Sequence, residues 1–266
     1  MIKLFVTDMD GTFLHDDKTM AENSFETIDR IHKQQKKFAI ASGRSYFDLK
    51  RQFESILSEV VLICNNGADA YDGGKLLYSQ AMSKESVIEI KKDLDKLDEA
   101  IAIYVTCNHA YIDRKTISNN RTMKEIILYY KGYELIDDLN SVEEEFVKIT
   151  ICHYQSSQDY IYPDVKQFEK DYKVVVSGKN WLDISHKDVN KGSAILKLRE
   201  LYKLSQDEVI VYGDFLNDLE MMQVSKHAYA PINAHPLIKA EASKIIESNN
   251  DDGVIKSINQ ILDEAL

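Results

Sequence analysis

The stretch Lys3–Leu14, with the sequence KLFVTDMDGTFL, contains the pattern that decides the fold. Its residues Leu4–Thr7 are apolar or β-branched, as in a short buried strand, and this pattern stops at Asp8. Asp8 and Asp10 lie two residues apart, and Gly11 permits a tight turn directly after them. Two carboxylates at the carboxyl end of a parallel strand repel each other unless a cation lies between them. A lone pair of this kind is usually only an acidic turn, so the rest of the chain decides whether a Mg²⁺ site is indicated.

The composition is that of a folded, acidic protein. Of the 266 residues, 44% are hydrophobic and 29% are charged, which predicts a packed core in one large or two ordinary domains. The formal net charge of −11 argues against nucleic acid or an anionic membrane as a partner. The net charge does not exclude a phosphorylated small molecule as a substrate, because the binding of a small anion depends on the cations close to it. We expect a cytoplasmic protein for three reasons. The three cysteines have no metal-ligand spacing, the sequence shows no apolar leader, and it has no run of about 18 apolar residues.

The order of strand and helix patterns predicts an α/β protein. Strands alternate with helices from the first strand to about residue 64, and again from residue 191 to the end of the chain. This alternation predicts a doubly wound parallel sheet formed by residues 1–81 and 186–266. Between these sections, residues 82–185 follow an αββ-type order, with one helix expected near 160–172. We therefore expect an inserted α+β domain at 82–185.

Four short polar clusters lie in the alternating sections. They are Asp8-Met9-Asp10-Gly11-Thr12, Ser42-Gly43-Arg44, Lys191-Gly192 and Gly213-Asp214-Phe215-Leu216-Asn217-Asp218. Three of them follow predicted strands directly, and the lysine cluster opens a helix. Because parallel strands end at the same edge of a sheet, we expect the clusters to meet there. Acids that suit a cation, combined with a hydroxyl, backbone N–H groups and a lysine that suit an anion, indicate a phosphate monoester bound beside Mg²⁺.

In this order, the motifs DMDGT, SGR, NKG and GDFLND resemble those of the haloacid dehalogenase superfamily of phosphatases. The inserted domain, between the second and third motifs, resembles the large cap of the Cof-type branch, subfamily IIB. Asn66-Gly67-Ala68 resembles a short NGA motif of that branch. The resemblance covers the whole chain, and the four motifs are specific only together. It implies a Mg²⁺ cofactor and a small phosphorylated metabolite as substrate, such as a sugar phosphate, a nucleotide, flavin mononucleotide or pyridoxal phosphate.

The resemblance also implies the catalytic roles. Asp8 would attack phosphorus and form an aspartyl phosphate. Asp10 would protonate the leaving alkoxide and later deprotonate the attacking water. Lys191 would supply the positive charge that lets Asp8 and the phosphate approach each other. The phosphate would be held by the Met9 N–H, Ser42, Gly43, Lys191 and Asn217.

The metal ligands implied by the resemblance are Asp8, the backbone carbonyl of Asp10, and Asp214. Thr12, Arg44 and Asp218 would lie behind the residues that touch metal and phosphate. Asp218 would orient Lys191 or a metal-bound water, and Arg44 is expected to be structural rather than a phosphate ligand. Within the inserted domain, segments 108–111 and 180–183 are the first candidates for setting substrate preference.

Two other interpretations stay open. A phosphomannomutase-like phosphotransferase has compatible motifs, but it would return the phosphoryl group to a second sugar hydroxyl and would need a sugar bisphosphate activator. A non-catalytic regulator phosphorylated on Asp8 would belong to a different class. Asp10 argues against the regulator, because a long-lived acyl phosphate gains nothing from an adjacent acid/base.

Overall fold

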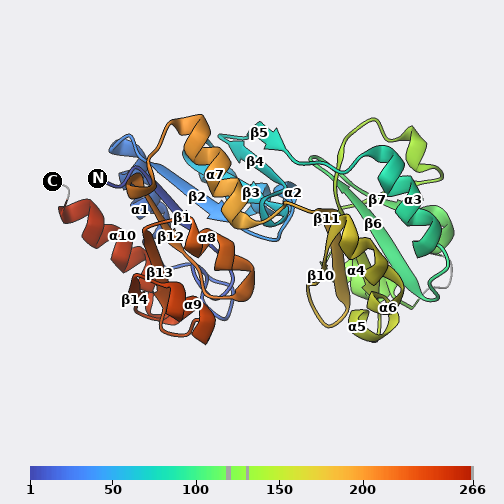
Figure 1. Ribbon diagram of the computed structural model, residues 1–266. Helices are drawn as coiled ribbons and strands as arrows, with labels where there is room; N and C mark the ends of the chain where they lie inside the picture. Colours follow the sequence, from blue (N-terminus) through green and yellow to red (C-terminus); the bar gives the residue numbers. More distant parts are fainter. Residues whose placement is uncertain (118–120, 130–131, 265–266) are drawn as a thin grey trace. The chain divides into compact units, whose positions relative to one another are not determined.

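The structure is a computed structural model that describes residues 1–117, 121–129 and 132–264. The chain forms two compact units (Figure 1). The core unit consists of Met1–Tyr78 and Asn190–Leu266, and the inserted unit of Ser79–Val189, where 82–185 was expected. No helix among the described residues is long and apolar enough to cross a membrane.

The core unit contains a sheet with the strand order β14-β13-β12-β1-β2-β3-β4-β5. Its strands are β1 (Leu4–Thr7), β2 (Lys37–Ala41), β3 (Val60–Cys64), β4 (Asp69–Asp72), β5 (Lys75–Ser79), β12 (Val209–Tyr212), β13 (His227–Pro231) and β14 (Lys244–Ile246). From β14 to β3 all neighbours are parallel, whereas β4 runs antiparallel to β3. β1 lies between β12 and β2, so the first strand of the chain is central and fully buried. The expected doubly wound parallel sheet is present.

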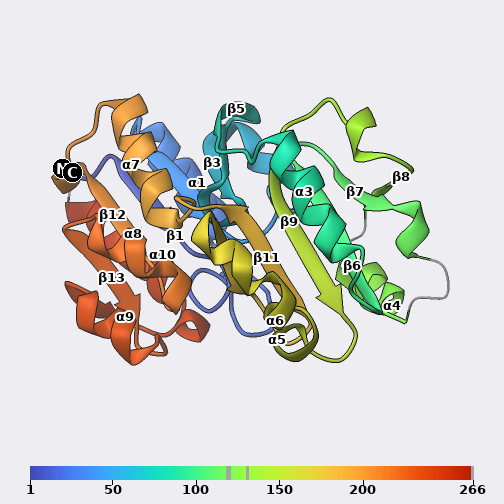
Figure 2. The same cartoon turned by 45° about the vertical axis from the view of Figure 1, so that its right-hand side comes forward.

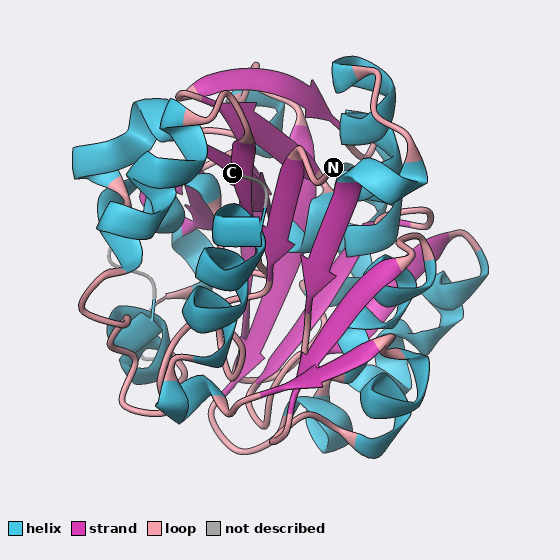
Figure 3. Ribbon diagram, turned by 90° about the vertical axis from the view of Figure 1, so that its left-hand side faces the viewer, coloured by secondary structure: helices cyan, strands magenta, loops and turns pink. Residues whose placement is uncertain are grey.

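Helices cover both faces of this sheet (Figure 3). They are α1 (Ser24–Lys33), α2 (Tyr46–Gln52), α7 (Lys191–Tyr202), α8 (Leu219–Gln223), α9 (Pro236–Glu241) and α10 (Gly253–Glu264). Because side chains alternate along a strand, Leu4 and Val6 share one face, where they belong to the same buried cluster as Ile195 of α7. On β12, the hydroxyl of buried Tyr212 lies 3.2 Å from that of Ser257 in α10. Burial of both faces explains why the strands read as continuous apolar runs.

The inserted unit contains a second sheet with the order β10-β11-β9-β6-β7-β8. Its strands are β6 (Ala100–Thr106), β7 (Ala110–Asp113), β8 (Glu134–Ile136), β9 (Phe146–His153), β10 (Tyr172–Val176) and β11 (Trp181–His186), and its helices are α3 (Lys84–Leu94), α4 (Met123–Tyr129), α5 (Ser157–Tyr160) and α6 (Tyr162–Val165). The neighbours are antiparallel except for the parallel pair β7 and β8. Val87 and Ile90 of α3 belong to one buried cluster with Ile149 and Ile151 of β9, and Figure 2 shows α3 beside this sheet.

The prediction of one helix near 160–172 was wrong. The structure has two short helices, α5 and α6, followed by a 3₁₀ segment at Lys166–Lys170 and then β10. Pro163 lies in the first turn of α6. Its ring removes a backbone donor and clashes with a preceding helical turn, so proline starts a helix but does not continue one. The short strand β8 was not expected, because three residues carry too little alternation to be recognised.

Candidate active site

The neighbouring strands β12, β1 and β2 bring three of the polar clusters to one edge of the core sheet. Thr7, the last residue of β1, lies beside Tyr212 of β12 and Ile40 of β2. The Asp8 N–H continues the pairing by donating to the Tyr212 carbonyl over 2.9 Å. The residues that follow these strands therefore emerge together, although those after β1 and β12 are more than two hundred positions apart in the sequence.

Lys191 joins two of the clusters through its buried ammonium group. Its Nζ lies 2.5 Å from Asp8 Oδ1 and 2.6 Å from Asp218 Oδ1. The side chain is fully buried, and a buried ammonium requires such charged partners. Burial acts to lower the pKa of Lys191, but the charges of Asp218 and Asp8 outweigh it and raise this pKa. Lys191 is therefore a fixed positive charge between the two acids.

The backbone at the start of α7 places Lys191 there. The Asn190 side chain accepts a hydrogen bond from the Ser193 N–H at 2.7 Å, and the Ser193 hydroxyl accepts one from the Asn190 N–H at 3.2 Å. This reciprocal cap fixes the first turn of the helix. A Cβ on Gly192 would lie 2.5 Å from the Glu220 carbonyl oxygen, so glycine permits α7 to approach the segment that carries the last motif.

Asp218 holds the loop of its own motif as well as Lys191. Its Oδ2 accepts hydrogen bonds from the N–H groups of Asp214 at 2.9 Å and Phe215 at 3.1 Å. With both carboxylate oxygens occupied and no exposed surface, Asp218 acts as a support for Lys191 and for the backbone of residue 214. The sequence interpretation expected Asp218 to orient Lys191 or a metal-bound water.

Asp214 lies against the first motif. Thr12 Oγ1 donates to Asp214 Oδ1 over 2.7 Å. Gly11 has a φ of +84°, and a Cβ there would lie 2.5 Å from Asp214 Oδ2. The glycine is required both by its backbone conformation and by this close approach. Thr12 and Gly11 therefore set where the Asp214 carboxylate can lie.

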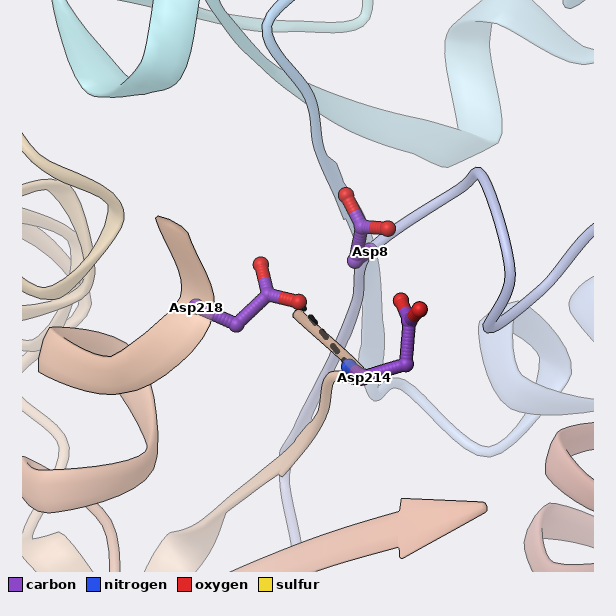
Figure 4. Close-up of side chains that lie close together, drawn as sticks. All are labelled: Asp8, Asp214 and Asp218. Carbon is purple, nitrogen blue, oxygen red and sulfur yellow. Dashed lines mark hydrogen bonds between the residues drawn. The ribbon is translucent and has the colours of Figure 1, made fainter. Parts of the chain in front are cut away.

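The carboxylates of Asp8, Asp214 and Asp218 form one cluster, with one oxygen of each lying within 4.8 Å of the others (Figure 4). Burial, followed by repulsion from neighbouring acids, raises the pKa of Asp8, and burial raises the pKa of Asp214 to about 6. One lysine cannot offset two buried acids and a third that is partly buried. Because carboxylates are the ligands that Mg²⁺ prefers, the donor set and its excess negative charge fit a divalent cation.

Asp10 is held by two cations. Its carboxylate accepts hydrogen bonds from Lys18 Nζ at 2.9 Å and from Arg44 Nη2 at 2.9 and 3.1 Å. Arg44 is itself anchored by Gln52 Oε1, 3.0 Å from Nη1. Partial burial acts to raise the pKa of Asp10, but the hydrogen bonds and charges of Lys18 and Arg44 lower it overall. Asp10 is thus ionised in this arrangement.

Lys18 was missed by the sequence interpretation, because it belongs to no motif and lies in the irregular segment between β1 and α1, where no periodic pattern relates it to Asp10. Arg44 was expected to be structural. In the structure it contacts the Asp10 carboxylate directly and holds it in place.

Of the residues expected to hold a phosphate, Met9 and Asn217 are next to Asp8 and Asp218 in the chain, and Ser42 follows β2, the strand paired with β1. Ser42 is buried, and its Oγ accepts a hydrogen bond from the Arg44 N–H at 3.2 Å. The Met9 carbonyl accepts three backbone hydrogen bonds from the turn that follows it, and the Met9 side chain is fully buried. Asn217 is exposed, and its Nδ2 donates to Asn66 Oδ1 over 3.4 Å.

The two segments of the inserted unit that were expected to set substrate preference make hydrogen bonds inside that unit. The donors that converge on the Glu144 carboxylate at 2.7 to 3.1 Å are Thr106 Oγ1, Asn108 Nδ2, His109 Nδ1 and Tyr111 OH. In the second segment, Asp183 Oδ1 accepts a hydrogen bond from Thr150 at 2.7 Å and lies 3.8 Å from Lys148 Nζ. Both segments therefore have polar side chains that are held by hydrogen bonds within the inserted unit.

Known proteins share this architecture. The haloacid dehalogenase-like hydrolase family matches residues 5–258. The 5-amino-6-(5-phospho-D-ribitylamino)uracil phosphatase YbjI of Escherichia coli is 30% identical, over 98% of this chain and 96% of its own. The 5-amino-6-(5-phospho-D-ribitylamino)uracil phosphatase YcsE of Bacillus subtilis is 25% identical, over 97% of this chain and 94% of its own. The crystal structure of TM0651 from Thermotoga maritima superposes with a TM-score of 0.86 at 23% identity, over 98% of this chain and 97% of that one.

The chain belongs to the haloacid dehalogenase-like hydrolases. It is a phosphatase of that superfamily that acts on small phosphorylated substrates. The resemblance of its motifs to that superfamily and the α/β fold are confirmed.

Proposed function

We propose that the protein is a Mg²⁺-dependent phosphatase that hydrolyses small phosphate monoesters through an aspartyl phosphate on Asp8. The main support is the buried group of Asp8, Lys191 and Asp218 beside Asp214. Two buried acids and one partly buried acid beside a single lysine cost free energy, and the fold would gain nothing from them without a cation and an anion to bind. Such a cost is typical of catalytic sites rather than of structural cores.

Asp8, Asp214 and the carbonyl of Asp10 are the proposed metal ligands. When bound, Mg²⁺ would offset the charge of these carboxylates and of the phosphate. Lys191 does the same from the buried side, and it also restrains the Asp8 carboxylate that it contacts. The two cations allow an anionic nucleophile to approach an anionic substrate, which is the main electrostatic problem in phosphoryl transfer.

The proposed reaction has two steps. In the first, an Asp8 carboxylate oxygen forms a bond to phosphorus while the ester P–O bond breaks, and the leaving alkoxide takes a proton from Asp10. In the second, water attacks the same phosphorus and loses its proton to Asp10, releasing phosphate and restoring the Asp8 carboxylate. Met9, Ser42, Gly43 and Asn217 hold the phosphate oxygens.

The contacts of Asp10 add one requirement to this scheme. Lys18 and Arg44 keep its carboxylate ionised, whereas the first step requires a protonated acid. Asp10 therefore has to leave these two cations before it donates its proton. We propose that Asp10 does so by a side-chain rotation, since 43% of its side chain is exposed.

The names of the relatives suggest which substrate to test first. Two of them are called 5-amino-6-(5-phospho-D-ribitylamino)uracil phosphatases, and we propose that compound as the first candidate substrate. Sugar phosphates, nucleotides, flavin mononucleotide and pyridoxal phosphate complete the set to be compared. All of them present a phosphate monoester on a small polar skeleton.

The decisive experiment is the release of inorganic phosphate from this panel with Mg²⁺. We expect the wild-type protein to release phosphate, and Asp8→Asn to fold and lose nearly all turnover. Activity that survives complete chelation of divalent ions would overturn the role of the metal, and an active Asp8→Asn variant would overturn the nucleophile. A phosphotransferase would instead turn over sugar phosphates only with a sugar bisphosphate activator.

A further inference from the structure

The turn that follows β3 has an unusual backbone. Asn65, Asn66 and Gly67 have successive φ values of +50°, +56° and +102°. Left-handed backbone is unfavourable for residues other than glycine, and it clusters at functional sites. A Cβ on Gly67 would lie 2.4 Å from the Asn190 carbonyl oxygen, so the turn packs directly on the residue before Lys191. The NGA motif therefore lies against Asn190, the residue that caps α7, and Lys191 is the first residue of this helix.

The same turn is tied to the Ser42–Arg44 loop. The Asn66 N–H donates to the Ser42 carbonyl and the Asn65 N–H donates to the Arg44 carbonyl, both over 2.9 Å. The Asn66 amide also lies against Gly43, where a Cβ would be 3.2 Å from Nδ2 and 3.3 Å from Oδ1. The backbone and the side chain of Asn66 are both restrained from this side.

The oxygen of this restrained amide faces the last motif. Asn66 Oδ1 accepts a hydrogen bond from Asn217 Nδ2 at 3.4 Å, across 151 positions of sequence. Asn217 is exposed, so its amide could otherwise rotate or present its oxygen instead of its nitrogen. With one N–H of the Asn217 amide directed to Asn66, the nitrogen end is selected, and its second N–H stays available as a donor.

We propose that Asn66 is a positioning residue that orients the Asn217 amide for donation to the phosphate of the substrate. The inference rests on the proposed phosphatase function and extends it to a residue that has no role in the four motifs. The Ser42–Arg44 loop restrains Asn66, and Asn66 restrains Asn217. The phosphate-binding groups of the second and fourth motifs are thus coupled through the turn after β3.

The test measures binding of inorganic phosphate by calorimetry in the presence of Mg²⁺, together with kcat and KM for a monoester substrate. Asn66→Gly keeps the left-handed backbone and the two backbone hydrogen bonds but removes the amide. We expect phosphate to bind about five- to tenfold more weakly, with KM affected more than kcat. Gln35→Gly is the matched control, because Gln35 is exposed with a φ of +57° and lies after α1. It should bind phosphate as the wild type does.

Coupling distinguishes positioning from a general structural effect. If Asn66 acts through Asn217, the double variant Asn66→Gly/Asn217→Ala should bind phosphate as weakly as Asn217→Ala alone. Asn66→Asp, which keeps the side-chain shape, should bind phosphate more weakly than the wild type, because it adds a negative charge beside the site, and wild-type binding by this variant would overturn the role of Asn66. It serves as the second test if Asn66→Gly unfolds.

The outcomes separate the two proposals. Losses that multiply in the double variant, or phosphate binding by Asn66→Gly at the wild-type level, would overturn the role of Asn66 and leave the phosphatase function standing. A wild-type protein that neither binds phosphate nor releases it from any monoester would overturn both.

Discussion

Two aspartates that contact the same lysine are expected to respond to neutralisation in opposite directions. Asp8→Asn should stabilise the metal-free protein, whereas Asp218→Asn should destabilise it. Both carboxylates lie within 2.6 Å of Lys191 Nζ. Asp218 has two further backbone donors, but Asp8 has a buried site that it shares with like charges.

The sign for Asp8 follows from its raised pKa. A carboxyl group whose pKa is higher in the folded state than in the unfolded state makes the protein less stable as the pH rises. For Asp8 this loss of unfolding free energy occurs between the ordinary pKa of 3.8 and the raised pKa. At pH 7 most of this cost is present. With its pKa raised to about 8, folded Asp8 binds a proton at pH 7 that the unfolded chain does not bind. Asparagine is neutral in both states and avoids this cost, so Asp8→Asn should return about 2 kcal/mol of unfolding free energy.

Asp218→Asn breaks a buried ion pair. The asparagine oxygen can keep the backbone donors of Asp214 and Phe215, but its NH₂ group then faces the Lys191 ammonium. Loss of one partner from a buried pair costs about 3 kcal/mol or more. The two substitutions are nearly isosteric, so packing does not account for a difference between them.

Scanning calorimetry at pH 7 with a chelator measures both variants. For a chain of this size, 1 kcal/mol corresponds to about 3 °C, so the midpoint should rise by about 6 °C for Asp8→Asn and fall by about 9 °C for Asp218→Asn. Calorimetry is needed because the single tryptophan, Trp181, lies in the inserted unit and reports on that unit. Asp207→Asn, which removes an exposed pair with Lys226, is the control and should leave the unfolding midpoint close to that of the wild type.

Destabilisation by Asp8→Asn in the absence of metal would refute the electrostatic reasoning, because it would mean that the buried carboxylate is net favourable. Mg²⁺ supplies a further check. It should stabilise the wild-type protein more than Asp8→Asn, since the variant has lost a ligand. Equal stabilisation of the two would remove Asp8 from the metal site.

Three other substitutions test separate parts of the structure. Gly11→Ala should lose most turnover in a phosphate-release assay, because the methyl group would meet the Asp214 carboxylate at 2.5 Å in a left-handed backbone; wild-type kcat would contradict this. Arg44→Met should raise the pKa of Asp10 and shift the pH profile of kcat to higher pH while KM stays within about twofold, and Arg44→Lys should reverse only part of the shift, because a single ammonium cannot reproduce the paired contact with Asp10; an unchanged pH profile of the methionine variant would contradict this. Glu144→Gln should destabilise the inserted unit by about 1 to 2 kcal/mol at pH 7 and by less near pH 3, followed by tryptophan fluorescence during urea unfolding. Burial acts to raise the pKa of Glu144, but its four donors lower it to about 2, so its stabilisation is present above about 4.5 and is lost as the pH falls toward 2; equal losses at both pH values would contradict this.

Much of the core unit could be predicted from near neighbours in the sequence. The apolar runs at β1, β2 and β3 and the helical periods between them depend on local alternation, and their order dictates a parallel sheet. The polar residues that follow these strands could be expected at one edge for the same reason. The broken helix at 160–172 could have been anticipated from Pro163, but apolar residues on both sides of it favoured a single helix.

The contacts that give each polar residue its role depend on the folded chain. Asp8 and Asp10 have the same side chain two positions apart, yet Asp8 meets a buried lysine and Asp10 meets the cations of Lys18 and Arg44. Their pKa values therefore shift in opposite directions. Nothing in the spacing of these residues encodes this difference, because it arises from burial and from partners up to 183 positions away.

The motifs alone determined the class of chemistry, because acids, a hydroxyl, glycines and a lysine in this order suit a phosphate and a divalent cation wherever they meet. Tertiary structure decided which acid is buried with Lys191, which is bound by other cations, and that the turn at Asn66 lies between the second and fourth motifs. The physical reason is that charge and hydrogen-bond energies depend on distance and burial in three dimensions, whereas sequence patterns record only the period along the chain.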